Sequence, residues 1–513
     1  MRVLFLLMAA CFATAVNAQS VLVWGTTQVP RHFNPAVQSG IATMMPGAQI
    51  FASPLRFDEK WQPQPYLAES WSFQDDGKSL LLKLVPNAKF HDGRPITSED
   101  VAFSILVAKQ NHPFQSMLAA VERVETPDAR IAIVRLSQPH PAILLALTSP
   151  FVPVLPKHIY GDGVDPKVHP RNTNPVGSGA YRFAEYKAGE HLILEKNKDY
   201  FLPGRPHFDR VIFRYFKDAN ALSLAIERKE IHFTPFWGEL AMIPRFEKTP
   251  GVAVTQKGGE AIGPINWLAI NTRKKPFDDV RVRKAIAYAI DRDFIVKKLH
   301  GGRTQAALGP IAPASPFYNP AVEPYKVDIA KANRLLDEAG LKAGAGGVRH
   351  ALTVDFIPGN REMHQNIAEY LKPQLKKVGF DVTVRAAPDF PTWAKRVGGH
   401  EFDLTTDSVF NWGDPVIGVH RTYLSSNIRP GVIWSNTQSY SNAKVDELLP
   451  KAGVERDATK RKGLYQEFQK IVVDEAPIVF LNLLPYYTIY DATLKNLPLT
   501  IWGACAPMDE MRR

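Results

Sequence analysis

Cysteine is nearly absent from this chain, since its 513 residues include two, Cys11 and Cys505. Two cysteines cannot build a disulfide framework or a zinc site made of cysteine ligands. The 14 histidines form no pair spaced three or four residues apart on an expected helix. The sequence therefore indicates no histidine-ligated metal, and we expect a protein without a metal or other cofactor.

A hydrophobic run long enough to cross a membrane is also missing. A membrane-spanning helix needs about 20 apolar residues, and the apolar stretch 3–15 is shorter and has no later counterpart. It follows Arg2 and ends in small residues, which is typical of a cleavable signal peptide. We expect cleavage after Ala18, so that a soluble periplasmic protein begins at Gln19. A lipidated Cys11 is the alternative, but it would leave an apolar segment of about six residues, shorter than the roughly seven to fifteen of signal peptides.

Neither low-complexity sequence nor charge of one sign dominates the chain. A content of 45% apolar and 22% charged residues predicts a folded protein with a large core, and the length favours two or three lobes. The net charge is +11, but basic and acidic residues alternate throughout. We therefore expect no nucleic-acid partner.

Recognisable catalytic motifs are missing as well. The string GSG at 177–179 lacks the spacing of a nucleophile elbow. The string GKS at 77–79 ends like a phosphate-binding loop, but Ser72 stands where the first glycine is needed. Paired carboxylates such as Asp278 and Asp279 are explained by helix capping. We assign no catalytic residue and expect no enzymatic activity.

Short strands and amphipathic helices mix along the whole chain, which predicts an α/β protein. We expect strands at 80–84, 192–195 and 210–216, and helices at 280–299, 329–339, 365–378 and 456–475. Between 352 and 404 strands alternate with helical stretches, as in a parallel, doubly wound sheet. Ligands of such sheets bind beyond the carboxyl ends of the strands. The loops that begin at Pro358 and Thr405 are therefore the first candidates for a binding site.

A series of strings, in order along nearly the whole chain, matches one known pattern. The strings are PYLAESW (65–71), DGK (76–78), KFHDGRPITSEDV (89–101), LPKH (155–158), NPVGSGAY (174–181), KNKDY (196–200), DVRVRKA (279–285), AIDR (289–292), YSN (440–442) and DELL (446–449). This series resembles solute-binding protein family 5. Members of that family are the extracytoplasmic receptors of ABC importers for oligopeptides, dipeptides, nickel and opines.

The resemblance implies a periplasmic binding protein-like architecture, in which two lobes with mixed sheets close on a cleft and a third domain is inserted. Domain I would be discontinuous and comprise 19–50, 172–266 and 485–513. Domain II would be an insertion at 51–171, and domain III would span 267–484. A ligand would bind between domains I and III, which close around it by hinge motion.

The resemblance also implies a function. The protein would be a monomeric periplasmic substrate-binding protein that captures a small solute, such as a peptide, an opine or an amino-acid conjugate. It would deliver this solute to its cognate ABC permease in the inner membrane for transmembrane transport. Two alternatives stay open: a hydrolase or chaperone built on the same scaffold, and a nickel- or haem-binding receptor. The missing catalytic motifs and the scattered histidines weigh against them.

The loop FNWGDP at 410–415 is the strongest candidate for ligand contact, because it combines aromatic and polar groups. In the family's dipeptide receptors, an aspartate in the equivalent loop holds the ligand's ammonium group. Alignment on the Gly-Asp-Pro end places Asn411 there, so a plain dipeptide would lose its strongest amine anchor. Arg361 falls near the family's carboxylate-binding arginine, and arginine is the favoured partner of a buried carboxylate. We therefore expect a ligand whose main charge is a carboxylate.

Seven residues are candidate ligand-binding residues on these grounds, two of them from the loop after the first strand. They are Thr27, Gln28, Arg361, Asn411, Trp412, Asp414 and Arg421.

Overall fold

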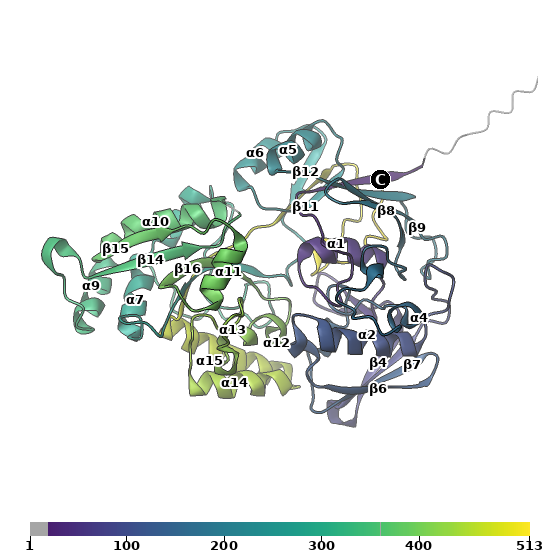
Figure 1. Cartoon of the computed structure of the whole chain (residues 1–513), viewed down its shortest axis with the longest axis horizontal. Coiled ribbons are helices and arrows are strands. Elements are labelled where there is room, and N and C mark those ends of the chain that lie inside the picture. Colours follow the sequence, from purple (N-terminus) through teal and green to yellow (C-terminus); the bar gives the residue numbers. More distant parts are fainter. Residues whose placement is uncertain (1–18, 360) are drawn as a thin grey trace, which may run out of the picture.

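Two main bodies lie side by side in the molecule (Figure 1). The structure, a computed structural model, describes residues 19–359 and 361–513, without the side chains of Arg361 and Glu362. The first body, lobe A, contains a seven-stranded, a four-stranded and a two-stranded sheet, and the second, lobe B, contains a five-stranded sheet. The chain is thus an α/β protein with two lobes and mixed sheets, as predicted. The predicted domain boundaries stay a prediction.

The seven-stranded sheet of lobe A draws its strands from separate parts of the chain, in the order β12-β18-β11-β1-β10-β9-β8. β1 pairs in parallel with β10 and β11, whereas all other neighbours are antiparallel. The strands are β1 (Val21–Thr26), β8 (Tyr181–Lys187), β9 (His191–Lys196), β10 (Arg210–Tyr215), β11 (Phe233–Trp237), β12 (Val252–Thr255) and β18 (Tyr487–Asp491). The predicted strands at 192–195 and 210–216 are confirmed here.

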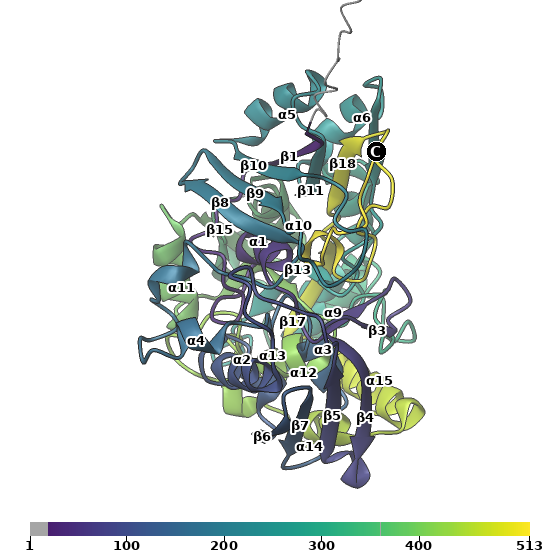
Figure 2. The same ribbon diagram turned by 90° about the vertical axis from the view of Figure 1, so that its right-hand side faces the viewer.

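The four-stranded sheet of lobe A is antiparallel and has the order β4-β5-β7-β6. Its strands are β4 (Ala68–Gln74), β5 (Ser79–Leu84), β6 (Val121–Asp128) and β7 (Ile131–Leu136), and β2 (Leu55–Phe57) pairs with β3 (Pro63–Pro65). The α-helices of lobe A are α1 (Ile41–Ile50), α2 (Ser98–Asn111), α3 (Ile143–Ala146), α4 (Lys157–Tyr160), α5 (Ala219–Glu227) and α6 (Ile243–Phe246). In Figure 2 the two large sheets lie one above the other, with α1 between them.

The five-stranded sheet of lobe B has the order β15-β14-β16-β13-β17. Its strands are β13 (Pro264–Ile270), β14 (His350–Phe356), β15 (Phe380–Arg385), β16 (Leu404–Phe410) and β17 (Ile478–Leu483). β14 pairs in parallel with β15 and β16, which confirms the predicted parallel unit. β13 is antiparallel to β16 and β17, so the whole sheet is mixed.

The helices of lobe B follow the predicted pattern with one exception. They are α7 (Val280–Ala289), α8 (Arg292–Phe294), α9 (Ile329–Glu338), α10 (Asn366–Lys376), α11 (Phe390–Gly398), α12 (Pro415–Gly418), α13 (His420–Tyr423), α14 (Ala443–Val454) and α15 (Ala458–Glu475), with π-helical turns η5 (Ile295–Leu299) and η7 (Arg361–Gln365). The single helix predicted at 280–299 is wrong, because Ile290 is extended and the Asp291 side chain caps a new helix by accepting the Phe294 N–H at 3.0 Å. An aspartate in this position favours a helix start over a helix interior.

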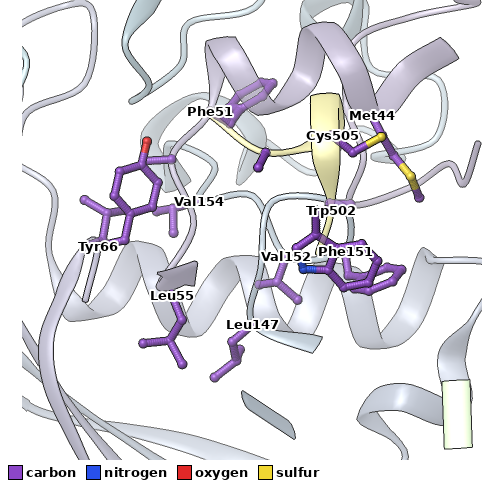
Figure 3. Close-up of a cluster of buried hydrophobic side chains, with 14 of the residues drawn as sticks. Met44, Phe51, Leu55, Tyr66, Leu147, Phe151, Val152, Val154, Trp502 and Cys505 are labelled. Carbon is purple, nitrogen blue, oxygen red and sulfur yellow. The ribbon is translucent and has the colours of Figure 1, made fainter. Parts of the chain in front are cut away.

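One apolar core joins the two large sheets of lobe A, and a second core fills lobe B. Figure 3 shows part of the first core, where Phe151 meets the Trp502 ring edge-on at 5.2 Å near the C-terminal end of the chain. Residues from both large sheets of lobe A thus share one core. Among the described residues, no helix is long and apolar enough to span a bilayer.

The Cys505 thiol lies in this core without any exposed surface, and burial raises its pKa. Thiol reagents attack the accessible thiolate. In protein that begins at Gln19, we expect an aromatic disulfide reagent to leave the native thiol unmodified and to react with one thiol per chain in denaturant. Rapid reaction of the native protein would show that the core in Figure 3 opens.

Candidate functional site

A cavity of about 490 Å³ lies where the chain crosses between the lobes. Lobe A contributes residues around Phe236 and 256–260, and lobe B contributes 302–305 and 312–314. The start of β13 and the end of β17, through which the chain enters and leaves lobe B, complete the wall. Its size falls within the roughly 300–1,000 Å³ of small-molecule sites. A ligand here would contact both lobes and both crossings.

The walls of this interlobe cavity are largely apolar or made of backbone. Tyr486 meets Phe236 edge-on at a centroid distance of 5.5 Å, and prolines and leucines line much of the remainder. Gly263 has a φ of 50°, and a Cβ there would lie 3.0 Å from the Asn411 Cβ and 3.2 Å from the Ala312 Cβ. Only glycine therefore lets this crossing lie so close to lobe B.

Two charged side chains line the cavity. Arg303 donates from Nη1 and Nη2 to the two carboxylate oxygens of Glu247 at 2.9 and 2.8 Å, so its charge is already compensated. Glu260 accepts the Gly258 N–H at 2.9 Å through Oε1, and its Oε2 is buried without a hydrogen-bond partner among the described residues.

A buried polar cluster lies at the same end of the lobe B sheet, beyond the parallel strands. The Ser408 hydroxyl donates to Asn266 Oδ1 at 2.7 Å, and Asn266 Nδ2 donates to Asn482 Oδ1 at 3.3 Å. His364 Nε2 lies 3.4 Å from the Ser408 hydroxyl. His300 lies close enough to His364 to influence its pKa electrostatically.

The two histidines of this cluster have ring nitrogens without a hydrogen-bond partner among the described residues. Neither ring nitrogen of His300 has a hydrogen bond within the described residues, and neither does Nδ1 of His364. Burial lowers the pKa of both to about 4, so both are neutral at pH 7. Buried polar groups in native proteins are nearly always hydrogen-bonded. The unpaired nitrogens therefore mark a place where an added molecule would supply the missing bonds.

Sequence reasoning missed His300, His364 and Glu260. The histidines lie far apart in the sequence, and only the fold brings them together: His300 directly follows η5, and His364 lies in η7. His364 does follow the loop that begins at Pro358, so the rule on strand ends pointed to the right region. No group of three or more potential metal ligands occurs among the described residues.

Asn411, the predicted replacement for an amine-binding aspartate, lies against the cavity wall. Its Nδ2 donates to the Pro310 carbonyl at 3.0 Å, and its Oδ1 accepts the Ala312 N–H at 2.7 Å. The side chain is buried and holds the 310–312 segment in place. Its role as a ligand-binding residue stays a prediction.

Trp412 and Asp414 make contacts that hold the loop in place. The Trp412 ring lies 5.6 Å from Phe114 and 6.3 Å from Phe151, both in lobe A. Asp414 accepts two hydrogen bonds from Arg461, at 2.7 and 2.8 Å, in a buried pair. Neither residue lines the cavity, and their predicted ligand contacts stay untested.

Arg421 lies near Asp407. Asp407 precedes Ser408 in β16, so its side chain points to the opposite face of the sheet. Its guanidinium covers the Phe114 ring at 4.7 Å, and Nε donates to the Gly418 carbonyl at 3.3 Å. Burial lowers the pKa of Arg421 to about 10 and raises the pKa of Asp407 to about 7, although the two charges favour each other. An additional anion could pair with this arginine, so a carboxylate-binding role for Arg421 stays a prediction.

Two of the remaining candidates, Thr27 and Gln28, lie outside the cavity lining. Thr27 is exposed, and Gln28 donates its N–H to the Thr26 hydroxyl at 3.0 Å in an ordinary turn. Arg361 begins η7, but its side chain lies outside the described part of the structure. For these three residues ligand binding stays a prediction.

The Asp414–Arg461 pair yields a prediction for stability. Removing one partner of a buried pair leaves a buried charge, so we expect Asp414→Asn to lower the free energy of unfolding by about 3–5 kcal/mol. Burial alone would raise the pKa of Asp414, but Arg461 outweighs it and the pKa lies below the ordinary 3.8. The difference in the free energy of unfolding between wild type and Asp414→Asn should therefore reach its full value above pH 3.8 and shrink as the pH falls below it.

Urea titrations at several pH values would measure this difference. The control is Glu447→Gln, which removes an exposed pair with Lys444 and should change stability by less than about 1 kcal/mol. Equal losses in both variants would contradict a special role of the buried pair.

Comparison with known proteins identifies relatives of the chain. Residues 62–430 match the family model of bacterial extracellular solute-binding proteins, family 5. A Brucella ovis protein named as an ABC transporter peptide-binding protein is 29% identical over 92% of this chain and 88% of its own length. The heme-binding protein A of Haemophilus influenzae is 27% identical over 90% and 86%. The oligopeptide-binding protein AppA of Bacillus subtilis, solved with a nonapeptide, superposes with a TM-score of 0.78 at 25% identity, covering 94% of this chain and 97% of AppA.

Proposed function

Since the chain belongs to family 5 of the bacterial extracellular solute-binding proteins, the substrate-binding components of ABC importers, we propose that it captures a peptide-like or opine-like small solute in the interlobe cavity. The observation that carries this proposal is the wall of that cavity, to which both lobes and both crossings contribute. A bound solute would hold the lobes together. The protein would then deliver it, as a monomer, to a cognate permease in the inner membrane.

The similar proteins support a peptide-like ligand. The Brucella protein is named as peptide-binding, and the AppA structure holds a nonapeptide. The cavity of about 490 Å³ suits a short peptide or an amino-acid conjugate.

A hydrolase on this scaffold is less well supported. His364 and Ser408 lie within 3.4 Å of each other, as a base and a nucleophile would. However, the Ser408 hydroxyl donates to Asn266, and His364 Nδ1 has no described partner to orient the ring. A working pair needs the base to be oriented by a third group. We therefore propose a binding protein without enzymatic activity.

A metal- or haem-binding role is also less well supported. His300 and His364 are two neighbouring imidazoles, and they fall short of the three or four protein ligands that metal sites in proteins use.

Ligand-linked stabilisation tests the proposed function. A ligand that binds the native state should add about 2.7 kcal/mol of stability at a hundredfold excess over its dissociation constant. We expect a rise in melting temperature and a change in tryptophan fluorescence with a member of a panel of short peptides and opine-like conjugates.

A variant pair makes this test specific to the cavity. Ala314 is an exposed residue of the cavity lining, and Ala458 is an exposed residue at the start of α15. Ala314→Trp should abolish the ligand-induced shift without changing the melting temperature of the free protein, whereas Ala458→Trp should keep the shift. Retained binding in Ala314→Trp would place the ligand elsewhere.

Export to the periplasm is a further part of the proposal. Residues 1–18 lie outside the described part, and the described fold begins directly after them, where the Ser20 N–H donates to Asp209 at 2.9 Å. We expect N-terminal sequencing of the exported protein to begin at Gln19. Recovery of a lipid-modified Cys11 would contradict cleavage after Ala18.

A further inference from the structure

The interlobe cavity has one charged group without a counter-ion. Of its two charged lining residues, Arg303 is neutralised by the two hydrogen bonds to Glu247. Glu260 forms no salt bridge with any Lys, Arg or His in the described part of the chain, and its Oε2 has no hydrogen-bond partner there. The cavity therefore carries an uncompensated negative charge on its lobe A side.

This carboxylate is attached to a fixed segment of backbone. The Gly259 N–H donates to the Thr500 carbonyl at 3.0 Å, and the Ala261 N–H donates to the Ile501 carbonyl at 2.8 Å. These bonds tie the residues on both sides of Glu260 to the C-terminal part of lobe A. Rotation about the last side-chain bond is nearly free for a carboxylate, so either oxygen can turn toward a bound molecule.

An unpaired carboxylate in a largely apolar cavity is unfavourable in the free protein. Native proteins pair buried charges because removing them from water is costly. The lining also contains Gln256, Thr304 and Gln305, but no side chain in the described part of the chain forms a hydrogen bond with Oε2 of Glu260. Because Glu260 is half-buried at the cavity wall, a ligand that enters the cavity can supply this partner.

We propose that Glu260 binds a positively charged nitrogen of the ligand, such as the ammonium group of a peptide or the protonated amine of an opine-like conjugate. This proposal rests on the proposed function and specifies the charge of its ligand. A charged nitrogen would donate to the free oxygen, and such charge-assisted hydrogen bonds are about twice as strong as neutral ones.

The position of Glu260 changes the expectation drawn from Asn411. The sequence suggested that the ligand's amine had lost its anchor. In the structure, the Asn411 side chain forms its hydrogen bonds with the backbone of Pro310 and Ala312. The negative charge at the cavity belongs to Glu260, on the opposite lobe. An amine held by Glu260 would be bound to lobe A, whereas the buried histidines lie in lobe B.

The test compares free and blocked amines. We would measure calorimetric affinities of wild type and Glu260→Gln for a panel of defined tripeptides and for the same peptides with N-acetylated amines. Gln keeps an oxygen for the Gly258 N–H but removes the charge. We expect at least a tenfold loss of affinity for free-amine peptides in Glu260→Gln, and at least a tenfold preference of wild type for the free amine over the acetylated form.

The outcomes separate the two proposals. Glu447→Gln, which removes an exposed carboxylate on α14, should leave every affinity unchanged. Free-amine peptides that bind wild type and Glu260→Gln equally would overturn the role of Glu260 and leave the proposed function standing. Failure of every peptide to bind wild type would overturn the proposed peptide-like ligand and, with it, this inference.

The stability of the free protein gives a second readout. An unpaired charge does not stabilise the fold, so Glu260→Gln should melt at the wild-type temperature or above it. A clear fall in melting temperature would show that the carboxylate has a structural partner and would overturn the proposal.

Discussion

The pairing of β13 with β17 is the constraint on which the site depends. The two strands lie next to each other in the lobe B sheet, and each continues directly into lobe A. Both crossings are therefore fixed at one end by the paired strands, whose register shifts once, between Asn266 and Trp267. The cavity forms where these crossings leave the sheet, so its walls from both lobes stay in register.

The loop after β16 connects the lobes a second time, through side chains. The buried Asp414–Arg461 pair holds the loop to α15, and Trp412 inserts its ring among aromatic residues of lobe A. In the loop that we expected to contact the ligand, Trp412 and Asp414 therefore form contacts within the protein, and those of Trp412 join the two lobes. This arrangement leaves recognition to groups that border the crossings, such as Glu260 and the histidine cluster.

The local structure could be predicted from the sequence because it depends on local patterns. Short apolar runs predicted β5, β9 and β10, and the helices predicted at 329–339 and 456–475 match α9 and α15 to within two residues at each end. The prediction of a single helix at 280–299 was wrong because Asp291 caps a new helix, although the apolar stripe continues past it. The family resemblance indicated the two-lobed form, which local patterns alone do not specify.

The candidate site could be predicted only in part, since its key contacts join residues distant in the sequence. His300, which follows η5, and His364, in η7, lie 64 positions apart in the sequence, and no spacing rule reveals such a pair. The sequence also gives no sign that the Asn411 side chain forms its hydrogen bonds with Pro310 and Ala312.

Electrostatics explains why these hidden residues matter most. When two lobes enclose a ligand, water leaves, and each charge on the ligand needs a protein partner. In lobe B, His300 and His364 have ring nitrogens without a partner among the described residues, and these neutral imidazoles can donate or accept a hydrogen bond without adding charge. In lobe A the unpaired group is a carboxylate. On the function proposed above, a ligand that contacts groups of both lobes holds the lobes together, so the contacts that select the ligand also stabilise the closed form.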